Sequence, residues 1–272
     1  MVANNQKNPI ISVITINYDR LEDLRKTFHS VISQSYSYIE YIIIDGGSQD
    51  GSLSFLQEND NQISFWVSEP DDGIFDAMNK GAAAATGDWI IFMNAGDIFY
   101  SHNTLSEVAP HLGDYTDVVY GATELVTINQ SNQEVRLYPP QELSNIWREI
   151  PATHQSVLIR REVQTDFLFD TSFTWCADHD LLIRLYAQGY RFKKVQTIIS
   201  RFDTSGGKQR DSAIYNRERW RLSRHGSNPV KRHSYYMYEY FKFLFLKHVV
   251  VKVRNALPNE WVLALRRYRG VC

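Results

Sequence analysis

The first hundred residues alternate apolar runs rich in β-branched residues with stretches of helical spacing, and this alternation limits the fold strongly. Each run ends in Gly, Asn, Asp or Pro, as buried strands commonly do. The runs cover residues 11–16, 39–45, 63–68 and 89–94, and the helical stretches cover 21–33, 52–58 and 74–85. Because strands that alternate with helices favour a parallel sheet, we expect a Rossmann-like α/β half over residues 9–100.

The rest of the chain is less regular. We expect a hairpin of strands 118–128 and 135–138 around 129–133, a strand at 156–161, and a helix at 180–188 closed by Gly189. These elements predict a mixed central sheet, with residues 101–214 completing a first domain of residues 1–214. From Tyr215 the pattern becomes helical, basic and aromatic, which predicts a C-terminal extension over residues 215–272.

Charge is divided unevenly along the chain. Residues 231–272 carry nine Lys and Arg against two Glu, whereas the first 230 residues carry 20 basic and 29 acidic side chains. The acidic body argues against a nucleic-acid partner, which requires a basic surface. The basic, aromatic tail is too interrupted by charge to span a bilayer, so it either docks peripherally on an anionic membrane or packs on the body as a structural helix.

Cysteine content and the N-terminus indicate the compartment. The two cysteines, Cys176 and Cys272, do not make a disulfide framework. Residues 1–8 are polar, and the apolar run that follows is too short for a signal-peptide core. We therefore expect a cytoplasmic protein.

Polar side chains follow the predicted strands at the edge where parallel sheets bind ligands. Thr15 and Asn17 end the first strand, Asp45 ends the second, and residues 69–72 and 94–97 follow the third and fourth. Asp45 is placed to accept hydrogen bonds from a nucleobase or ribose. The alternative is a turn carboxylate that caps backbone amides, with Asp50 as the N-cap. A dinucleotide fingerprint is absent, because the Gly-x-Gly-x-x-Gly spacing does not occur after the strand.

The next two segments suggest diphosphate and metal contacts. Asp72 and Asn79 are candidates to recognise a base, and Lys80 to face a diphosphate; a solvated turn and a surface lysine are the alternative. Asp97 is a candidate ligand for Mg²⁺ or Mn²⁺, since a bound diphosphate supplies further oxygens. A simple Gly-Asp turn remains the alternative for Asp97.

Two later residues are candidates for proton transfer or positioning. Asp178, near the start of a predicted helix, is placed to take a proton from an acceptor hydroxyl as a general base. It would equally serve as the N-cap of that helix. His154 is either part of the same site or a hydrogen-bonded core histidine.

Taken in order, these segments resemble family 2 glycosyltransferases of the GT-A fold, especially the bacterial group that builds O-antigen, capsule and colanic-acid-like polysaccharides. The resemblance runs from about Pro9 to Arg210. It rests on the segments 12–17 (SVITIN), 44–48 (IDGGS), 68–70 (SEP), 72–74 (DGI), 76–81 (DAMNKG), 86–88 (TGD), 94–97 (NAGD), 154–155 (HQ), 177–181 (ADHDL) and 206–207 (GG). Each segment is weak alone, but the ordered set is specific.

The resemblance implies a role for each candidate. The implied nucleotide contacts are Thr15, Asn17, Asp45, Asp72, Asn79 and Lys80. Asp97 then corresponds to the last residue of the DxD-type metal motif and Asp178 to the catalytic base, while the implied contacts to donor sugar or acceptor are Asn94, His154, Gln155 and Asp180. The sequence departs from the family pattern at Asn94, Gly96 and Ala177, where many members carry acids.

The implied activity is inverting, metal-dependent transfer of a hexose from a nucleotide diphosphate sugar to a glycan hydroxyl. The first half would bind the donor and the second half the acceptor. We expect a lipid-linked acceptor at the inner face of the plasma membrane, with a protein-linked or free glycan open. UDP-hexose is the expected donor, with GDP- and dTDP-sugars open. One alternative is a catalytically silent sugar-nucleotide or polysaccharide-binding module. A pyrophosphorylase is less compatible, because residues 15–19 lack the glycine-rich loop such enzymes carry after the first strand.

Overall fold

The computed structural model describes residues 8–129, 132–204, 212–225 and 229–245. The chain forms two compact units, Met1–Gly226 and Ser227–Cys272. The first unit extends beyond residue 214, where the sequence suggested a boundary, and includes helix α7 (Ser212–Leu222). In the second unit, the described residues form helix α8 (Pro229–Phe245). Residues 246–272, the rest of the predicted C-terminal extension, lie outside the described part. No helix of the described chain is long and apolar enough to cross a membrane.

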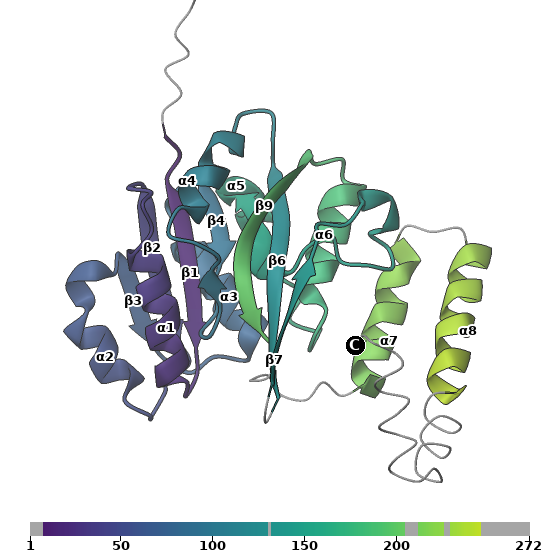
Figure 1. The fold of residues 1–272 in the computed structure, drawn as a ribbon, viewed down its shortest axis with the longest axis horizontal. Helices are drawn as coiled ribbons and strands as arrows, with labels where there is room; N and C mark the ends of the chain where they lie inside the picture. Colours follow the sequence, from purple (N-terminus) through teal and green to yellow (C-terminus); the bar gives the residue numbers. More distant parts are fainter. Residues whose placement is uncertain (1–7, 130–131, 205–211, 226–228, 246–272) are drawn as a thin grey trace, which may run out of the picture. The chain divides into compact units, whose positions relative to one another are not determined.

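In the described part of the first unit, nine strands form one mixed sheet (Figure 1). The parallel part has the order β3-β2-β1-β4 and continues through β8, β6, β9 and β5, with β7 paired to β6. These strands are β1 (Ile11–Asn17), β2 (Ile39–Asp45), β3 (Phe65–Ser68), β4 (Trp89–Phe92), β5 (Ile98–Phe99), β6 (Val118–Asn129), β7 (Asn132–Tyr138), β8 (Val157–Arg160) and β9 (Phe192–Asp203). The parallel half and the hairpin follow the sequence expectations, whereas β5 and β9 were not expected.

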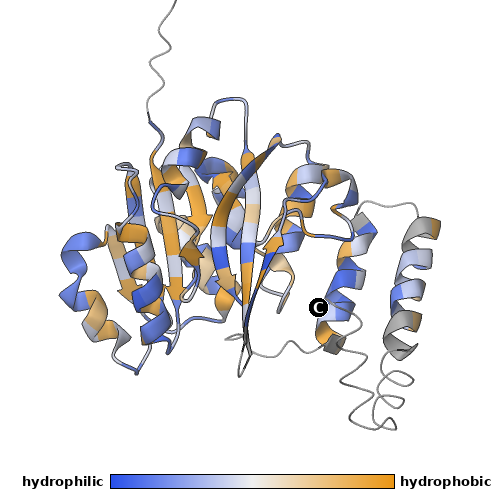
Figure 2. Cartoon of the chain, in the orientation of Figure 1, coloured by the Kyte–Doolittle hydropathy of each residue, from blue (hydrophilic) through white to orange (hydrophobic). Residues whose placement is uncertain are grey.

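Strand side chains alternate between two apolar cores, one on each face of the sheet. In β1, Ile14 and Ile16 face one core, and Ile11 and Val13 face the other. This period of two follows from the pleat of a strand and explains why strands covered on both faces are almost wholly apolar. Hydrophobic strands inside a more polar shell of helices are visible in Figure 2.

Helices cover both faces of the sheet. Apolar residues of α1, α2 and α4 pack in the core that contains Ile11 and Val13, and those of α3, α5, α6 and α7 pack in the other. The helices of this unit are α1 (Leu21–Ile32), α2 (Ser52–Glu58), α3 (Ile74–Ala84), α4 (Thr104–Val108), α5 (Arg161–Asp166), α6 (Ala177–Ala187) and α7. Helix α6 begins at Ala177 instead of residue 180, which places Asp178 inside its first turn and Cys176 at the N-cap.

Candidate active site

The carboxyl ends of β1, β2 and β3 carry a buried polar cluster. Asp45 is fully buried and pairs in register with Asn17, which donates from Nδ2 to Asp45 Oδ1 at 2.8 Å. Ser48 donates to both carboxylate oxygens through its amide and hydroxyl, and Ser68 Oγ donates to Oδ2 at 2.6 Å. The sheet register therefore brings Asn17 and Asp45 together, and four donor groups satisfy the Asp45 carboxylate.

A second polar group follows β4. Asn94 and Asp97 lie on the loop after this strand, and their neighbour across the site is His154, in the 3₁₀ turn His154–Ser156. Asn94 Nδ2 lies 3.0 Å from His154 Nε2, and Asp97 Oδ2 lies 3.8 Å from the same nitrogen. The amide nitrogen of Asn94 is a donor, so it donates to Nε2 when the ring proton sits on Nδ1.

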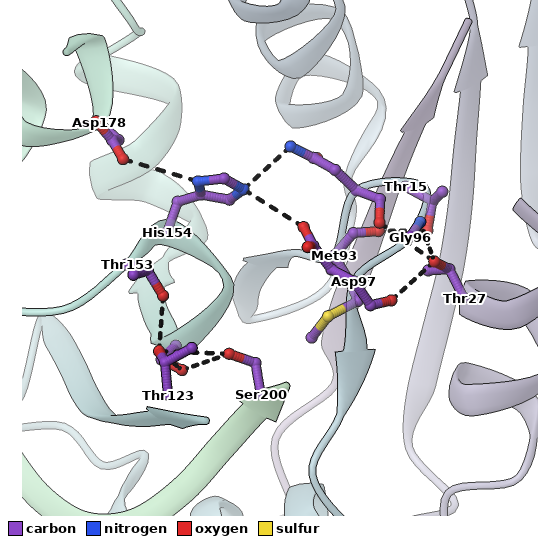
Figure 3. A network of polar contacts seen from close by, with 12 residues as sticks. Thr15, Thr27, Met93, Gly96, Asp97, Thr123, Thr153, His154, Asp178 and Ser200 are labelled. Atoms are coloured by element: carbon purple, nitrogen blue, oxygen red, sulfur yellow. Dashed lines mark hydrogen bonds and ion pairs between the residues drawn. The ribbon is translucent and has the colours of Figure 1, made fainter. Parts of the chain in front are cut away.

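The Nδ1 side of His154 faces Asp178. Its nitrogen lies 3.7 Å from Asp178 Oδ2, so the ring stands between two carboxylates that belong to different halves of the unit (Figure 3). Asp178 Oδ1 accepts the backbone N–H of His179 at 2.7 Å. The structure thus joins Asn94, Asp97, His154 and Asp178 in one constellation.

The two carboxylates have pKa values shifted in opposite directions. Burial raises the pKa of Asp97 to about 6, despite the opposing influence of His154 and Gln155. Burial acts the same way on Asp178, but the proximity of His154 outweighs it and lowers the pKa of Asp178 from its ordinary value. Titratable pairs with divergent pKa values are typical of sites that divide electrostatic and acid–base roles.

The loop that carries Asp97 is held by α1. Thr27 Oγ1 donates to the Asp97 carbonyl at 2.7 Å and accepts the Gly96 N–H at 2.9 Å (Figure 3). Gly96 has φ of 103°, a left-handed conformation that side chains rarely adopt. This backbone requirement accounts for the glycine at this position. Thr27 was missed in the sequence because a threonine in a helix carries no local signal of this contact.

A buried hydroxyl cluster fixes the turn that carries His154. Thr153 Oγ1 and Thr123 Oγ1 lie 2.7 Å apart, and Ser156 Oγ lies 2.7 Å from both Thr123 Oγ1 and Ser200 Oγ. Strands β6 and β9 supply Thr123 and Ser200 (Figure 3). Because the cluster is satisfied internally, it orders the turn, and none of its members was singled out in the sequence.

Several expected site residues face internal partners instead of the crevice. Thr15 is fully buried and donates to the Met93 carbonyl at 2.8 Å, which ties β1 to the loop after β4. Asn79 pairs both amide atoms with the backbone of Phe169. Asp180 is buried and forms an ion pair with Arg184 at 2.7 Å.

The remaining candidates lie near the two clusters or at the surface. Gln155 is buried, hydrogen-bonds Asp97, and leaves Oε1 without a partner among the described residues. Asp72 is exposed in the turn after β3. Lys80 Nζ donates to the Pro70 carbonyl at 2.9 Å and forms ion pairs with Glu69 and Asp76. In this structure it therefore stabilises the turn after β3. The two glycines at 206–207, which contributed to the family resemblance, lie outside the described residues.

Oxygen ligands for a hard cation are present beside His154. The described residues contain no group of three or more His, Cys, Asp or Glu that would hold a metal by itself. The Asp97 carboxylate is buried, however, and Asn94 Oδ1 is a buried acceptor without a partner in the described chain. Mg²⁺ and Mn²⁺ prefer such oxygens and commonly share them with phosphate. The residues therefore fit a metal held jointly by protein and diphosphate.

Known proteins resemble this chain in sequence. An uncharacterized glycosyltransferase of Mycobacterium tuberculosis is 29% identical over 214 residues, which cover 76% of this chain and 80% of the relative. A PGL/p-HBAD biosynthesis glycosyltransferase of Mycobacterium bovis is 26% identical over 206 residues, covering 73% of this chain and 78% of the relative.

Solved structures resemble it in fold. TarS 1–349 of S. aureus in complex with UDP superposes with a TM-score of 0.59 at 17% identity, over 79% of this chain and 64% of that chain. The chain thus spans less than two thirds of that fragment. Mannosyltransferase PcManGT from Pyrobaculum calidifontis, in complex with GDP-Man and Mn2+, gives a TM-score of 0.60 at 18% identity over 97% of this chain and 81% of that chain. The fold is of the GT-A type.

The family model for glycosyl transferase family 2 matches residues 12–176, more than half of the chain. Its match spans the polar clusters after β1, β2 and β4 and the turn that carries His154, and it ends two residues before Asp178. On this match, the chain belongs to glycosyl transferase family 2.

Proposed function

We propose that this glycosyltransferase moves a hexose, with inversion, from a nucleotide diphosphate sugar to a hydroxyl of a glycan acceptor. The observation that carries the proposal is the line Asp97–His154–Asp178, in which the carboxylates at its two ends have opposite pKa shifts. An inverting transfer needs one group that stabilises the leaving diphosphate and another that takes the proton from the attacking hydroxyl. Asp97 is the candidate for the first role and Asp178 for the second.

Asp178 is the proposed general base. Its lowered pKa keeps it ionised at neutral pH, and its side chain is 20% exposed, so a hydroxyl can approach it. A carboxylate with a low pKa is a weak base toward a free alcohol. Proton transfer is therefore expected to accompany attack on the anomeric carbon, when the hydroxyl becomes more acidic, and such a base contributes about 10²–10⁴-fold.

Asp97 is the proposed metal ligand, with Asn94 Oδ1 as a neighbouring oxygen. When bound, Mg²⁺ or Mn²⁺ would stabilise negative charge on the leaving diphosphate. His154 separates this region from the base and orients Asp178 through its Nδ1 side. The Mn²⁺ in the complex of the Pyrobaculum mannosyltransferase supports metal use.

The donor half is proposed to lie around Asn17, Asp45, Asp72 and Lys80. Complexes of TarS with UDP and UDP-GlcNAc, and of the mannosyltransferase with GDP-Man, support a nucleotide-sugar donor. We keep a UDP-sugar as the first candidate. Lys80 would have to exchange its contacts in the turn for the diphosphate, whereas Thr15 and Asn79 are proposed to support the crevice from inside.

The acceptor is proposed to be lipid-linked, in cell-surface polysaccharide synthesis at the cytoplasmic face of the membrane. A relative named for PGL/p-HBAD biosynthesis supports a glycolipid-type acceptor. Helix α8 also exposes large apolar side chains, among them Val230, Met237 and Phe241, which are exposed by 73%, 49% and 59%. These side chains would bury at the headgroup boundary while the cations of the tail attract anionic lipid.

The decisive experiment compares wild type with Asp178→Asn across a panel of UDP-, GDP- and dTDP-sugars with Mn²⁺ or Mg²⁺. The variant should lose transfer by at least about 100-fold while its affinity for the nucleoside diphosphate changes only a few-fold, because the base acts on the acceptor. Near-normal turnover in a folded variant would refute the assignment. A wild type that binds sugar nucleotides but turns over none of them with any acceptor would favour a silent binding module.

A further inference from the structure

A carboxylate from α7 holds the backbone just before the proposed base. Glu218 is 8% exposed. Its oxygens accept the backbone N–H groups of Thr174, Trp175 and Cys176 at 2.6, 2.9 and 3.1 Å. Hydrogen bonds to an ionised acceptor are stronger than neutral ones, and here three of them converge on consecutive residues.

In the described structure, the N-cap residue of helix α6, Cys176, makes no capping hydrogen bond through its side chain. Without a partner, the Cys176 N–H would be one of the unsatisfied donors that every helix N-terminus leaves. Glu218 satisfies it from another helix, and a negative charge at this end also interacts favourably with the helix dipole.

We propose that Glu218 is a positioning residue that fixes the segment 174–178 and thereby sets the place of the Asp178 carboxylate opposite His154. The proposal rests on the proposed function, in which Asp178 is the base. Asp178 is the second residue of α6, so its position follows the start of that helix. The described hydrogen bonds of Glu218 all go to residues 174–176, and none goes to the strands that carry the donor candidates.

The consequence should be specific to the chemical step. Removing the carboxylate leaves three adjacent amides to find other partners and frees the start of α6 to shift. A displacement of about 1 Å in a reacting group can cost about 100-fold in rate. The donor crevice would keep its own contacts, since Asn17 and Asp45 are held by β1, β2 and the serines beside them.

The test uses the full chain with Glu218→Ala, Glu218→Gln and the control Arg221→Ala. Arg221 lies on the same helix, donates hydrogen bonds to Ser172 and Asp170, and stacks on Phe173, and in the described structure it forms no hydrogen bond with residues 174–176. For each variant we would measure kcat with the active donor, affinity for UDP with Mn²⁺, thermal stability, and hydrogen exchange of peptides covering 174–178.

Glu218→Ala should lower kcat by about 10- to 100-fold with UDP affinity within about 3-fold of wild type, and should speed exchange at 174–178. Glu218→Gln, which keeps one acceptor oxygen, should fall in between, and Arg221→Ala should keep wild-type kcat. If Glu218→Ala does not fold, Glu218→Gln decides on the same readouts. Parallel losses of kcat and UDP affinity that track thermal stability, or unchanged exchange at 174–178, would overturn the proposal.

Asp178→Asn measured alongside separates the two claims. If that variant retains turnover, the proposed function fails, and the exchange data alone report on Glu218. If it is inactive while Glu218→Ala turns over normally, the positioning role fails and the proposed function stands.

Discussion

Without metal, the wild-type protein should lose stability as pH rises, and the Asp97→Asn variant should not show this loss. Burial, opposed by His154 and Gln155, raises the pKa of this carboxyl from 3.8 to about 6. In the unfolded chain Asp97 ionises near 3.8, whereas the folded protein keeps the proton until about 6. Stability should therefore fall as pH rises between these values and remain lower above them. At about 1.4 kcal/mol per pKa unit, the full loss is about 3 kcal/mol.

The assay is urea unfolding of wild type and Asp97→Asn in EDTA at pH values from about 4 to about 8. Other titrations largely cancel in the difference between the two proteins. The unfolding free energy of the variant minus that of wild type should rise by about 2–3 kcal/mol from the lowest to the highest pH. Much of this rise should be complete by about pH 6.

Asp117→Asn is a control of opposite sign. Hydrogen bonds from Arg191 outweigh burial and lower the pKa of Asp117, so its stabilisation is present above the ordinary pKa and lost as pH falls. A difference between Asp97→Asn and wild type that does not change with pH would refute the reasoning about Asp97. Near pH 8, Mn²⁺ with UDP should reduce the difference in unfolding free energy between Asp97→Asn and wild type. The reason is that a cation bound beside Asp97 offsets the buried charge and stabilises wild type alone.

Two further predictions concern packing and the tail. A Cβ at Gly81 would lie 2.4 Å from Ile14 Cγ2, so Gly81→Ala should lower the unfolding free energy by about 1–3 kcal/mol; an unchanged urea midpoint would contradict this. Full-length protein should co-sediment with anionic liposomes, less so as salt rises, and lose this binding when residues 231–272 are deleted. If the intact chain ignores such liposomes and the deletion is insoluble, the tail belongs to the fold instead.

Much of the first half of the fold could be predicted because its strands are covered on both faces. Such strands are mostly apolar, as in β1, β2 and β4, and can be recognised in the sequence without knowledge of their partners. Strand β9 was missed because Lys193, Lys194 and Arg201 interrupt its apolar residues. Its extended conformation depends on parallel pairing with β6, which lies far away in the sequence. The two residues of β5 likewise depend on β9.

The start of α6 illustrates the same limit at the candidate site. The sequence predicted a helix from residue 180 with Asp178 as its candidate N-cap, because cysteine, which stands at residue 176, is not among the residues favoured at an N-cap. In the structure the helix begins at Ala177, and Glu218, 42 positions away from Cys176, accepts the N–H of this N-cap residue. This changes Asp178 from a possible N-cap into a side chain of the first helical turn.

The sequence by itself determined the class of fold, the strand ends at which polar residues gather, and the resemblance that pointed to the family. These properties follow from the order of residue types along the chain. Only the tertiary structure decided which polar side chains face one another: Asp97 and Asp178 meet at His154, whereas Thr15 and Asp180 turn to internal partners. The physical reason is that strand register and helix start are set by hydrogen bonds between distant segments, and these fix the direction of each side chain.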